Sequence, residues 1–312
     1  MIKKKDKIYL AGHKGLIGSA ILRKLIEEGY KNIITIDKKK LDLTNQSKVN
    51  KFIKKQKPKF IFIAAAKVGG IYSNNKFKAD FIYENLMIQT NLINAAYNNG
   101  VKNLIFLGSS CIYPKFSKQP IKENYILSGE LEKTNDAYAI AKIAGIKMCE
   151  SYNNQYGTNY KCLMPTNTFG PNDNYHEFNS HFIASLIKKI YLIKKKRLNH
   201  IKIWGNGKAK REIIFVDDIA DACVFFMNKK IKESFINIGT GKDLSITQYV
   251  RLFLKVLLPD KKIKIIYDRS KPNGTPKKLM SINLAKKYGW KAKTILNDAI
   301  LKTYNHYSNL ET

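Results

Sequence analysis

The fold is decided by Ile8-Tyr-Leu-Ala11 and the stretch that follows it, Gly12-His-Lys-Gly15-Leu-Ile-Gly18. The four apolar residues predict a buried strand, and the apolar periodicity over 16–28 predicts a helix. Glycines at this junction permit a tight turn, and the free N–H groups of the helix N-terminus attract a pyrophosphate. A glycine-rich turn in an ordinary strand–helix unit is the alternative, but the spacing in this context favours a dinucleotide-binding loop. The residues of the expected loop are Gly12, His13, Lys14, Gly15, Leu16, Ile17 and Gly18.

Outward from this loop, short apolar runs alternate with helical patterns along the first half of the chain. Strands are expected at 33–36, 60–64, 103–107 and 160–164, and helices at 80–98 and 137–155. Strands that are apolar throughout are typical of a parallel sheet covered on both faces. With right-handed crossovers, the pattern predicts an α/β fold with a Rossmann-type doubly wound parallel sheet.

The character of the sequence changes after Pro165. Residues 166–180 are rich in Asn, Pro, Gly and aromatics and predict a long ordered loop, which in a compact domain is usually functional. Later helices are expected at 181–194, 217–227 and 246–257, and strands at 201–204, 213–216, 235–238 and 263–267. We therefore expect a dinucleotide-binding domain of residues 1–168 plus 212–236. A smaller C-terminal substrate-binding lobe is expected over residues 169–211 plus 237–312, with a cleft between the two.

Composition excludes several classes of protein. The 312 residues include 56 Lys and Arg against 24 Asp and Glu, a net charge of +32. No basic stripe with interleaved aromatics marks a nucleic-acid surface, and nucleotide substrates suit this charge equally well. No apolar run approaches the ~20 residues of a membrane helix, and no signal peptide is recognisable. Four widely spaced cysteines predict neither a disulfide framework nor a metal site, so we expect a cytoplasmic protein.

The end of the second expected strand carries mixed signals about the cofactor. Asp37 is positioned to accept hydrogen bonds from an adenosine ribose, which favours NAD. Lys38 beside it is positioned to hold a 2′-phosphate, which favours NADP, although a lysine run is often simply a solvated surface. Asp42 is a candidate adenine contact, with a capping role as the alternative. The sequence leaves the choice between NADP and NAD open.

Tyr138-Ala-Ile-Ala-Lys142 places a phenol and an ammonium on one face of a helix. A nearby ammonium favours the phenolate, which predicts a lowered pKa for Tyr138 and a proton donor that works near neutrality. Ser109 lies at the carboxyl end of an expected strand, where ligands bind in such sheets. Cys111 lies two residues further on and is expected to flank the same centre, although a buried structural cysteine is commoner. Together these residues and the dinucleotide loop indicate a short-chain dehydrogenase/reductase.

Several longer stretches resemble the GDP-L-fucose synthases, the GDP-4-keto-6-deoxy-D-mannose 3,5-epimerase/4-reductases of the extended short-chain dehydrogenase/reductase family. They include Ala64-Ala-Ala-Lys-Val-Gly-Gly70, Gly108-Ser-Ser-Cys-Ile-Tyr-Pro-Lys115, Pro165-Thr-Asn167, Asn179-Ser-His181 and Ser270-Lys-Pro-Asn-Gly-Thr-Pro276. The resemblance runs over essentially the whole chain. It implies NADP-dependent 3,5-epimerisation and 4-reduction of the GDP-sugar, and a homodimer built on the helices expected at 80–98 and 137–155.

The resemblance also implies roles for individual residues. Ser109, Tyr138 and Lys142 match the reductase triad, and Cys111 and His181 match the base and acid of the epimerisation. The implied cofactor positions, to which the residues themselves add Asp42, are Gly12 to Gly18, Lys38, Leu107, Gly108, Ser109, Ser110, Lys142, Pro165, Thr166, Asn167, Thr168 and His181. The implied substrate positions are Lys189, Trp204, Arg211 and Lys264. Lys14, Lys38 and Lys189 stand where the family often carries Arg, and Lys lacks the planar fork that binds phosphate through two hydrogen bonds.

Three alternatives remain open at the level of the sequence. The first is C4 reduction, with or without epimerisation, of a related GDP-4-keto-6-deoxy sugar or heptose. The second is a nucleotide-sugar 4-epimerase with tightly held NAD, which Asp37 favours and which Cys111 and His181 disfavour. The third is a non-enzymatic polyanion- or RNA-binding protein on a reductase scaffold, and the intact set of Ser109, Tyr138 and Lys142 argues against it.

Overall fold

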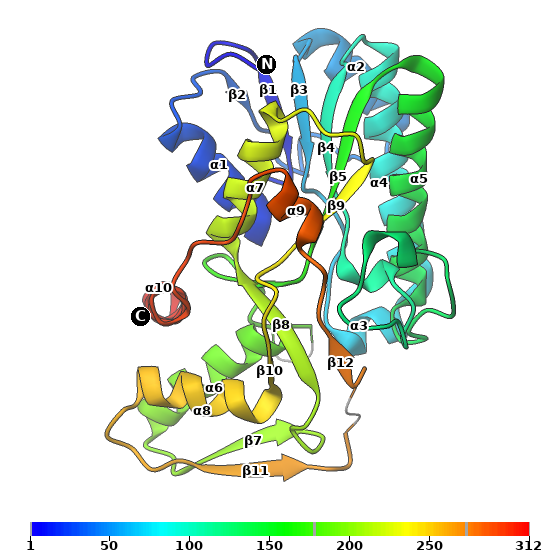
Figure 1. The fold of residues 1–312 in the computed structure, drawn as a ribbon. Coiled ribbons are helices and arrows are strands. Elements are labelled where there is room, and N and C mark those ends of the chain that lie inside the picture. The colour runs from blue at the N-terminus through cyan, green and yellow to red at the C-terminus, as the bar shows by residue number, and fades with distance from the viewer. Residues whose placement is uncertain (1, 177–178, 272–273, 312) are drawn as a thin grey trace.

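The computed structural model describes residues 2–176, 179–271 and 274–311, and its larger lobe is built on a six-stranded sheet (Figure 1). The strand order is β2-β1-β3-β4-β5-β9, and every neighbouring pair is parallel. The strands are β1 (Ile8–Ala11), β2 (Ile33–Ile34), β3 (Phe60–Ile63), β4 (Asn103–Leu107), β5 (Asn159–Pro165) and β9 (Phe235–Ile238). The expected α/β fold with a doubly wound Rossmann-type sheet is confirmed.

Helices cover both faces of this sheet, as the uniformly apolar strands predict. In β1 and β3 every residue is buried, and Leu10 lies beside Phe62 in the parallel register. One face packs against α1 (Leu16–Glu27) and α7 (Val216–Asn228), which also contact each other. The other face carries α2 (Gln46–Gln56), α4 (Lys78–Asn98) and α5 (Asp136–Tyr156), seen on the right of Figure 1. Each face therefore has its own apolar core.

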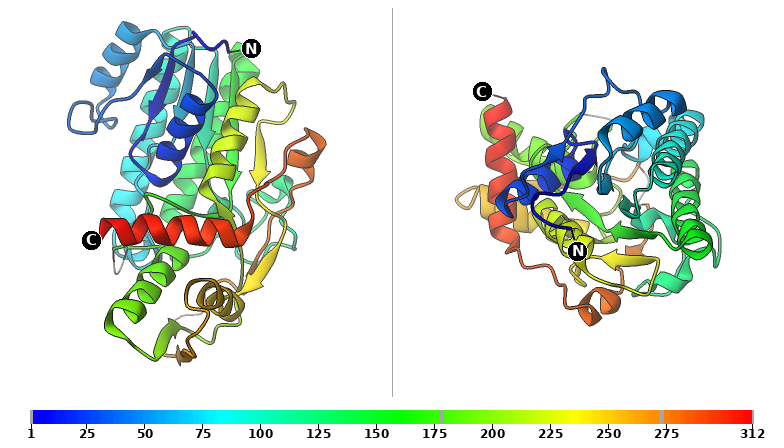
Figure 2. Two further views of the ribbon diagram at one scale, coloured as in Figure 1. Left: turned by 90° about the vertical axis from the view of Figure 1, so that its left-hand side faces the viewer. Right: turned by 90° about the horizontal axis from the view of Figure 1, so that it is seen from above.

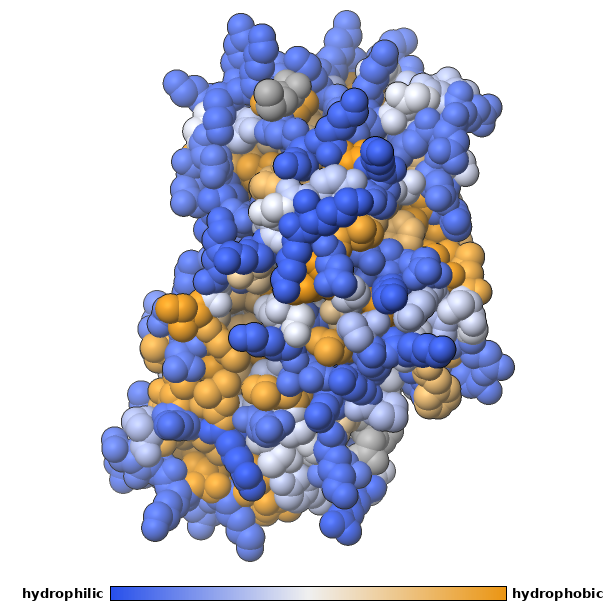
Figure 3. All heavy atoms as spheres, viewed as in Figure 1, coloured by the Kyte–Doolittle hydropathy of each residue, from blue (hydrophilic) through white to orange (hydrophobic). Residues whose placement is uncertain are grey.

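The smaller lobe holds short sheets and the helices that pack on them. One sheet joins β10 (Asp243–Ser245), β8 (Lys210–Phe215) and β12 (Lys277–Lys278), with β6 (Asn167–Phe169) also paired to β8. A second joins β7 (His200–Trp204) and β11 (Lys264–Asp268). The helices are α6 (Phe182–Lys196) and α8 (Ile246–Leu257), with α10 (Leu296–Leu310) packed against both (Figure 2). In Figure 3, apolar side chains gather at the lower left, over these helices.

The remaining elements are short. They are α3 (Ile71–Lys76), α9 (Asn283–Lys287) and the 3-10 turns η1 (Ser110–Ile112) and η2 (Glu123–Tyr125). The expected elements and the structure differ in two respects. The loop expected over 166–180 contains β6, whose pairing partner β8 lies some forty residues further along the chain and gives no local signal. The helices α2 and α10 and the short α3 and α9 were not predicted; in α2 only Val49 and Ile53 of the eleven residues are buried, which leaves a weak apolar pattern.

The expected division into two domains stays a prediction, and two strands bear on its boundaries. The boundary after residue 236 falls inside β9, a strand of the large sheet. Most of β8, expected in the dinucleotide-binding domain from residue 212 onward, belongs to the small sheet of the other lobe. Pro272 and Asn273, in the stretch Ser270 to Pro276 that carries part of the resemblance, lie outside the described residues.

Candidate active site

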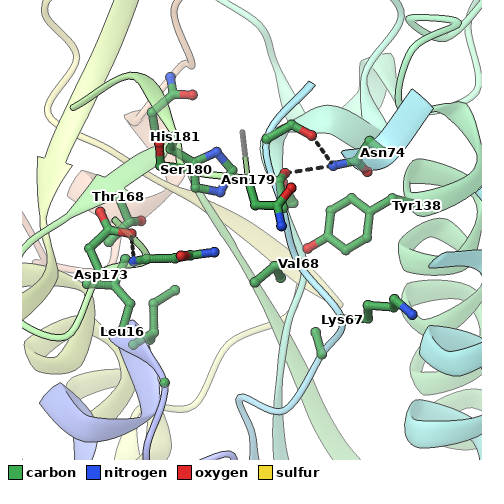
Figure 4. Close-up of a pocket in the computed structure, with 18 of the residues that line it drawn as sticks. Leu16, Lys67, Val68, Asn74, Tyr138, Thr168, Asp173, Asn179, Ser180 and His181 are labelled. Atoms are coloured by element: carbon green, nitrogen blue, oxygen red, sulfur yellow. Dashed lines mark hydrogen bonds between the residues drawn. The ribbon is translucent and has the colours of Figure 1, made fainter. Parts of the chain in front are cut away.

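A cleft of about 1660 Å³ runs from the glycine-rich loop at the carboxyl ends of β1 and β2 to the sheets of the smaller lobe. Residues from both lobes line it, as the sequence predicts. Figure 4 shows part of its interior: Tyr138 reaches in from α5 on one side, and His181, Thr168 and Asp173 lie on the opposite side. The start of α1 at Leu16 closes this view from below.

The glycine-rich loop forms one end of the cleft, and all seven of its residues, 12 to 18, line it. Gly12 has φ +89°, and a Cβ there would lie 2.6 Å from the backbone nitrogen of Ala65. A Cβ on Gly18 would collide with the carbonyl oxygen of Gly12. Helix α1 starts directly after Gly15 with no side-chain cap, so its first N–H groups remain available to an anion. This cradle fits the pyrophosphate of a dinucleotide.

Charged side chains meet beyond this loop, where β2 ends. The carboxylate of Asp37 forms an ion pair with Lys14, whose Nζ atom lies 2.8 Å from Oδ1. The Nε2 atom of His13 lies 3.4 Å from the same oxygen. Lys38 lies 3.7 Å from Glu84 on α4. Asp42 also lines the cleft, but its carboxylate accepts hydrogen bonds from the backbone and hydroxyl of Thr44, and these hydrogen bonds lower its pKa. The turn-capping role weighed for Asp42 is therefore present in the structure.

Tyr138 and Ser109 line the middle of the cleft, and Lys142 lies behind them. The ammonium of Lys142 donates to the carbonyl oxygen of Leu107 at 2.8 Å and lies 5.7 Å from the centre of the Tyr138 ring. Neither Leu107 nor Lys142 lines the cleft; both are buried, with Lys142 only 3% exposed. Gly108 and Ser110 line it beside Ser109. The structure therefore brings Ser109, Tyr138 and Lys142 together, with Ser109 and Tyr138 facing the cleft and Lys142 buried behind them.

The protonation states of this group differ in part from the expectation. Burial raises the pKa of Tyr138, and the nearby Cys111 adds to this, while a hydrogen bond with Ser109 opposes it. The lowered pKa expected from the Lys142 ammonium is therefore wrong for this arrangement, because desolvation of the phenol outweighs the distant charge. Burial lowers the pKa of Lys142 to about 8. In this state Tyr138 is a protonated phenol, which suits a proton donor.

Cys111 and His181 lie in the same part of the cleft and are joined there by a third group, Lys278 of β12. Burial raises the pKa of the Cys111 thiol, while the charges of Lys278 and Lys142 and a hydrogen bond with Ser109 lower it. Burial and the charge of Lys278 lower the pKa of His181. The pair therefore rests as a thiol and a neutral imidazole. Lys278 is itself buried, and burial lowers its pKa.

The far end of the cleft carries three of the four expected substrate residues. Lys189, Trp204 and Arg211 line it. The guanidinium of Arg211 donates to the carbonyl oxygens of Lys210 and Thr275, at 2.8 and 2.5 Å. These hydrogen bonds fix the orientation of the guanidinium at the side of the cleft. Trp204 is 45% exposed and offers one broad aromatic face, with Lys271 5.8 Å from its ring centre. Lys264 does not line the cleft, because it begins the edge strand β11 with its side chain exposed.

The segment after β5 lines the cleft through Pro165, Thr166, Asn167 and Thr168. Asn167 is anchored by donating to the carbonyl oxygen of Glu212 at 2.7 Å. The Glu212 carboxylate is fully buried and accepts from the backbone N–H groups of Thr240, Gly241 and Met280 at 2.7 to 2.9 Å. The buried Glu212 carboxylate therefore anchors the backbone next to β8, which carries Arg211, and next to β12, which carries Lys278.

Lys278 and Asp173 are the main cleft residues that the sequence analysis did not identify. Lys278 is one of more than fifty basic residues, and only the pairing of β12 with β8 brings it to Cys111. Asp173 lies in the loop that was flagged as functional, and one of its buried carboxylate oxygens has no partner in the described structure. Burial raises the pKa of Asp173 to about 7.

Two further expectations concern what the described part of the chain does not contain. Across residues 2–176, 179–271 and 274–311, no cluster of His, Cys, Asp and Glu has a geometry that would hold a metal ion. Within the same residues, none of the helices combines the length and apolar character needed to cross a bilayer.

Comparison with known proteins adds independent findings. Residues 8–239 match the model of the NAD dependent epimerase/dehydratase family. GDP-L-fucose synthase 1 of Arabidopsis thaliana is 47% identical over 307 residues, covering 98% of this chain and 94% of that protein. A GDP-mannoheptose C4 reductase from Campylobacter jejuni, solved with NADP, is 37% identical with a TM-score of 0.89, covering 99% of this chain and all of that one. A GDP-L-fucose synthetase from Naegleria fowleri, bound to NADP, is 26% identical with a TM-score of 0.90, covering 100% and 97%.

Proposed function

The chain belongs to the NAD dependent epimerase/dehydratase family, and from that premise we propose that it converts GDP-4-keto-6-deoxy-D-mannose to GDP-L-fucose. It is an NADP-dependent enzyme that epimerises C3 and C5 and then reduces C4. The observation that carries the proposal is the position of Cys111, His181 and Tyr138 around one space in the cleft. Two acid–base groups and one proton donor are what epimerisation followed by reduction requires.

Epimerisation relies on the C4 ketone, which acidifies the hydrogens on the two neighbouring carbons. One side chain removes such a proton from one face of the sugar ring, and another returns a proton to the opposite face. At rest Cys111 is a thiol and His181 a neutral imidazole, so moving one proton from the thiol to the imidazole makes Cys111 the base and His181 the acid. The charge of Lys278 lowers the pKa of both residues, so it stabilises the thiolate of Cys111 and makes the imidazolium of His181 a stronger acid.

Reduction follows epimerisation because it removes the activating ketone. The chemistry that NADPH supplies when bound is hydride transfer to C4. Ser109 holds the C4 oxygen by a hydrogen bond, and Tyr138 delivers a proton to it. Lys142 supports Tyr138 from behind, where its own hydrogen bond to the Leu107 carbonyl fixes the position of the ammonium. The glycine-rich loop and the segment from Pro165 to Thr168 position the dinucleotide.

The far end of the cleft is assigned to the GDP moiety. Arg211 presents a planar guanidinium that is suited to two phosphate oxygens, and its backbone acceptors already orient it. Trp204 offers a stacking surface for a base or ribose. Lys189 adds a positive charge, and its ammonium donates to the carbonyl oxygen of Lys202 at 2.8 Å. Lys264 is left out of this assignment because its side chain lies outside the cleft.

The proposal is tested by following absorbance at 340 nm with purified protein, NADPH and GDP-4-keto-6-deoxy-D-mannose, and by identifying the product with NMR. Oxidation of NADPH with formation of GDP-L-fucose is the expected result. Oxidation that yields an unepimerised 6-deoxy sugar would keep the reductase and remove the roles of Cys111 and His181. No oxidation by folded protein would refute the substrate assignment.

A second candidate is C4 reduction of a related GDP-4-keto heptose. The similarity to the Campylobacter jejuni GDP-mannoheptose C4 reductase favours it. The two candidates share Ser109, Tyr138 and Lys142 and differ in the sugar substituents remote from C4. Parallel assays with the 6-deoxyhexose and the heptose substrate, compared by kcat/KM, decide between them.

The chain is proposed to act as a homodimer in a reducing cytoplasm. The helices α4 and α5 pack on each other and leave apolar side chains such as Tyr83 and Ile140 exposed, by 61% and 48%. A four-helix bundle with the same helices of a second copy would cover them. Ile140→Lys is expected to give a monomer in light scattering, and an unchanged mass would refute this interface.

The four cysteines are all free and buried, which suits a reducing compartment.

A further inference from the structure

The two acid–base groups assigned to epimerisation come from different lobes of the molecule. Cys111 lies in η1, between β4 and α5 of the larger lobe, whereas His181 immediately precedes α6 of the smaller lobe. The groups assigned to reduction, Ser109, Tyr138 and Lys142, all belong to the larger lobe. The separation of the epimerisation pair therefore depends on how the segment before α6 is held against the larger lobe.

Two hydrogen bonds join that segment to the larger lobe. The backbone N–H of Gly70 donates to the carbonyl oxygen of Asn179 at 2.9 Å, and the hydroxyl of Ser73 donates to the side-chain oxygen of Asn179. A Cβ on Gly70 would lie 2.7 Å from the carbonyl oxygen of Ser180, so the two backbones approach as closely as a glycine allows. Both contacts lie within two residues of His181, and Figure 4 shows the segment at the side of the cleft.

The part of the larger lobe that makes these contacts is itself well anchored. The side-chain amide of Asn74, in α3, donates to the carbonyl oxygens of Gly69 and Gly70 at 2.6 and 3.0 Å (Figure 4). The side-chain amide of Asn85, in α4, exchanges two hydrogen bonds of 3.0 Å with the backbone of Lys67. Asn74 and Asn85 are both buried. Residues 67–74 are therefore a fixed support for the segment at Asn179.

On its other side, His181 is held by the helix that it precedes. Its carbonyl oxygen accepts from the backbone N–H of Ser185 at 3.0 Å, and α6 packs into the core through buried residues such as Ile183 and Ile187. The side chain of His181 does not cap α6. Because helix ends fray, the position of this imidazole depends on the contacts that hold the residues just before it.

We propose that Ser73 and Asn179 are positioning residues that hold His181 opposite Cys111, and that their hydrogen bond sets the rate of epimerisation relative to reduction. This inference rests on the proposed function, since it concerns the acid–base pair of that reaction. A catalytic group that is displaced by about 1 Å loses up to about a hundredfold in rate. The groups used in reduction do not depend on this hydrogen bond, because their anchors lie within the larger lobe.

The test measures the two half-reactions separately in the full-length enzyme. Epimerisation is followed as deuterium incorporation at C3 and C5 of GDP-4-keto-6-deoxy-D-mannose in D2O with NADP+. Hydride transfer is followed in reverse, as the first turnover of GDP-L-fucose oxidation by NADP+ at 340 nm. We expect Ser73→Ala to slow deuterium incorporation about ten- to hundredfold and to change hydride transfer less than about threefold.

A second variant and a control complete the design. Asn179→Ala removes the other half of the hydrogen bond and should cause a similar loss, and the double variant should lose no more than either single one. Ser151→Ala is the matched control, because the Ser151 hydroxyl donates to the carbonyl oxygen of Lys147 on the exposed side of α5, away from the cleft. Circular dichroism verifies that each variant is folded.

The outcomes distinguish this inference from the function on which it rests. Ser73→Ala protein that loses both half-reactions by the same factor, or neither of them, would overturn the positioning role. Losses that simply add in the double variant would show that Ser73 and Asn179 act independently, which also overturns it. Folded wild-type protein that neither exchanges deuterium nor transfers hydride with these sugars would overturn the proposed function, and this inference with it.

Discussion

We expect the substitution Lys142→Met to make the folded protein more stable while it removes reductase activity. The Lys142 ammonium is buried, and its pKa falls from an ordinary 10.5 to about 8. A shift of that size corresponds to about 3 kcal/mol by which folding disfavours the charged form at pH 7. Methionine has a similar length and carries no charge, so it avoids this cost.

Two favourable contacts of the ammonium offset part of that gain. Its hydrogen bond to the Leu107 carbonyl and its position 4.6 Å from the centre of the Phe106 ring are both lost in Lys142→Met. Together these are worth about 1–2 kcal/mol. The net expectation at pH 7 is a stabilisation of about 1–2 kcal/mol, together with a loss of reductase activity of about a hundredfold or more.

The pH dependence gives this prediction a distinctive signature. Between pH 8 and 10.5 the folded wild type releases the Lys142 proton while the unfolded chain still binds it, so the wild type gains stability as the pH rises. All other titrating groups are shared by the two proteins. The advantage of Lys142→Met should therefore shrink as the pH rises above about 8 and should already have reversed at pH 10.

Urea unfolding at pH 7 and pH 10, followed by circular dichroism at one fixed protein concentration, measures both effects. Lys147→Met is the matched control on the same helix, because Lys147 is exposed and its ammonium forms a surface ion pair with Glu150 at 2.7 Å. It should change the free energy of unfolding by less than about 0.5 kcal/mol. A Lys142→Met protein less stable than wild type at pH 7, or a difference that does not vary with pH, would refute the reasoning.

Three further predictions concern the reacting groups and the packing behind them. Tyr138→Phe should abolish hydride transfer but leave NADPH binding, measured by fluorescence, unchanged; normal reduction would remove Tyr138 from the mechanism. Cys111→Ser should slow deuterium incorporation from solvent at C3 and C5 far more than it weakens substrate binding, and equal exchange in the two proteins would leave Cys111 a packing residue. Gly145→Ala should destabilise the fold by about 1–3 kcal/mol in urea unfolding, because a Cβ there would lie 2.6 Å from the Phe106 ring, and unchanged stability would show that α5 moves freely.

The dinucleotide end of the site was accessible from the sequence because its determinants are local. Gly12 and Gly18 act within one strand–turn–helix unit, and their spacing alone places them. Tyr138 and Lys142 share a face because they are four residues apart on a helix. The apolar β1 and β3 predict a sheet buried on both faces, which is the sheet that the structure contains.

The substrate end was less accessible because its residues are brought together by pairing between distant strands. Lys278 reaches Cys111 only because β12 pairs with β8, and the buried Glu212 binds backbone groups up to 68 residues away. Lys264 had no local feature to show that β11 would turn its side chain away from the cleft. The resemblance to a known family identified most of the substrate-binding residues, but it did not identify Lys278 or Asp173.

The sequence by itself determined the parallel sheet, the glycine cradle and the alignment of Tyr138 with Lys142. These follow from side-chain periodicity and glycine conformation over a few residues. Only the tertiary structure decided which charged side chains form ion pairs and which titratable groups are protonated. It paired Asp37 with Lys14, and it buried Tyr138, so that the phenol keeps its proton. Charge interactions depend on distance and on exclusion of water, and neither is fixed until the chain has folded.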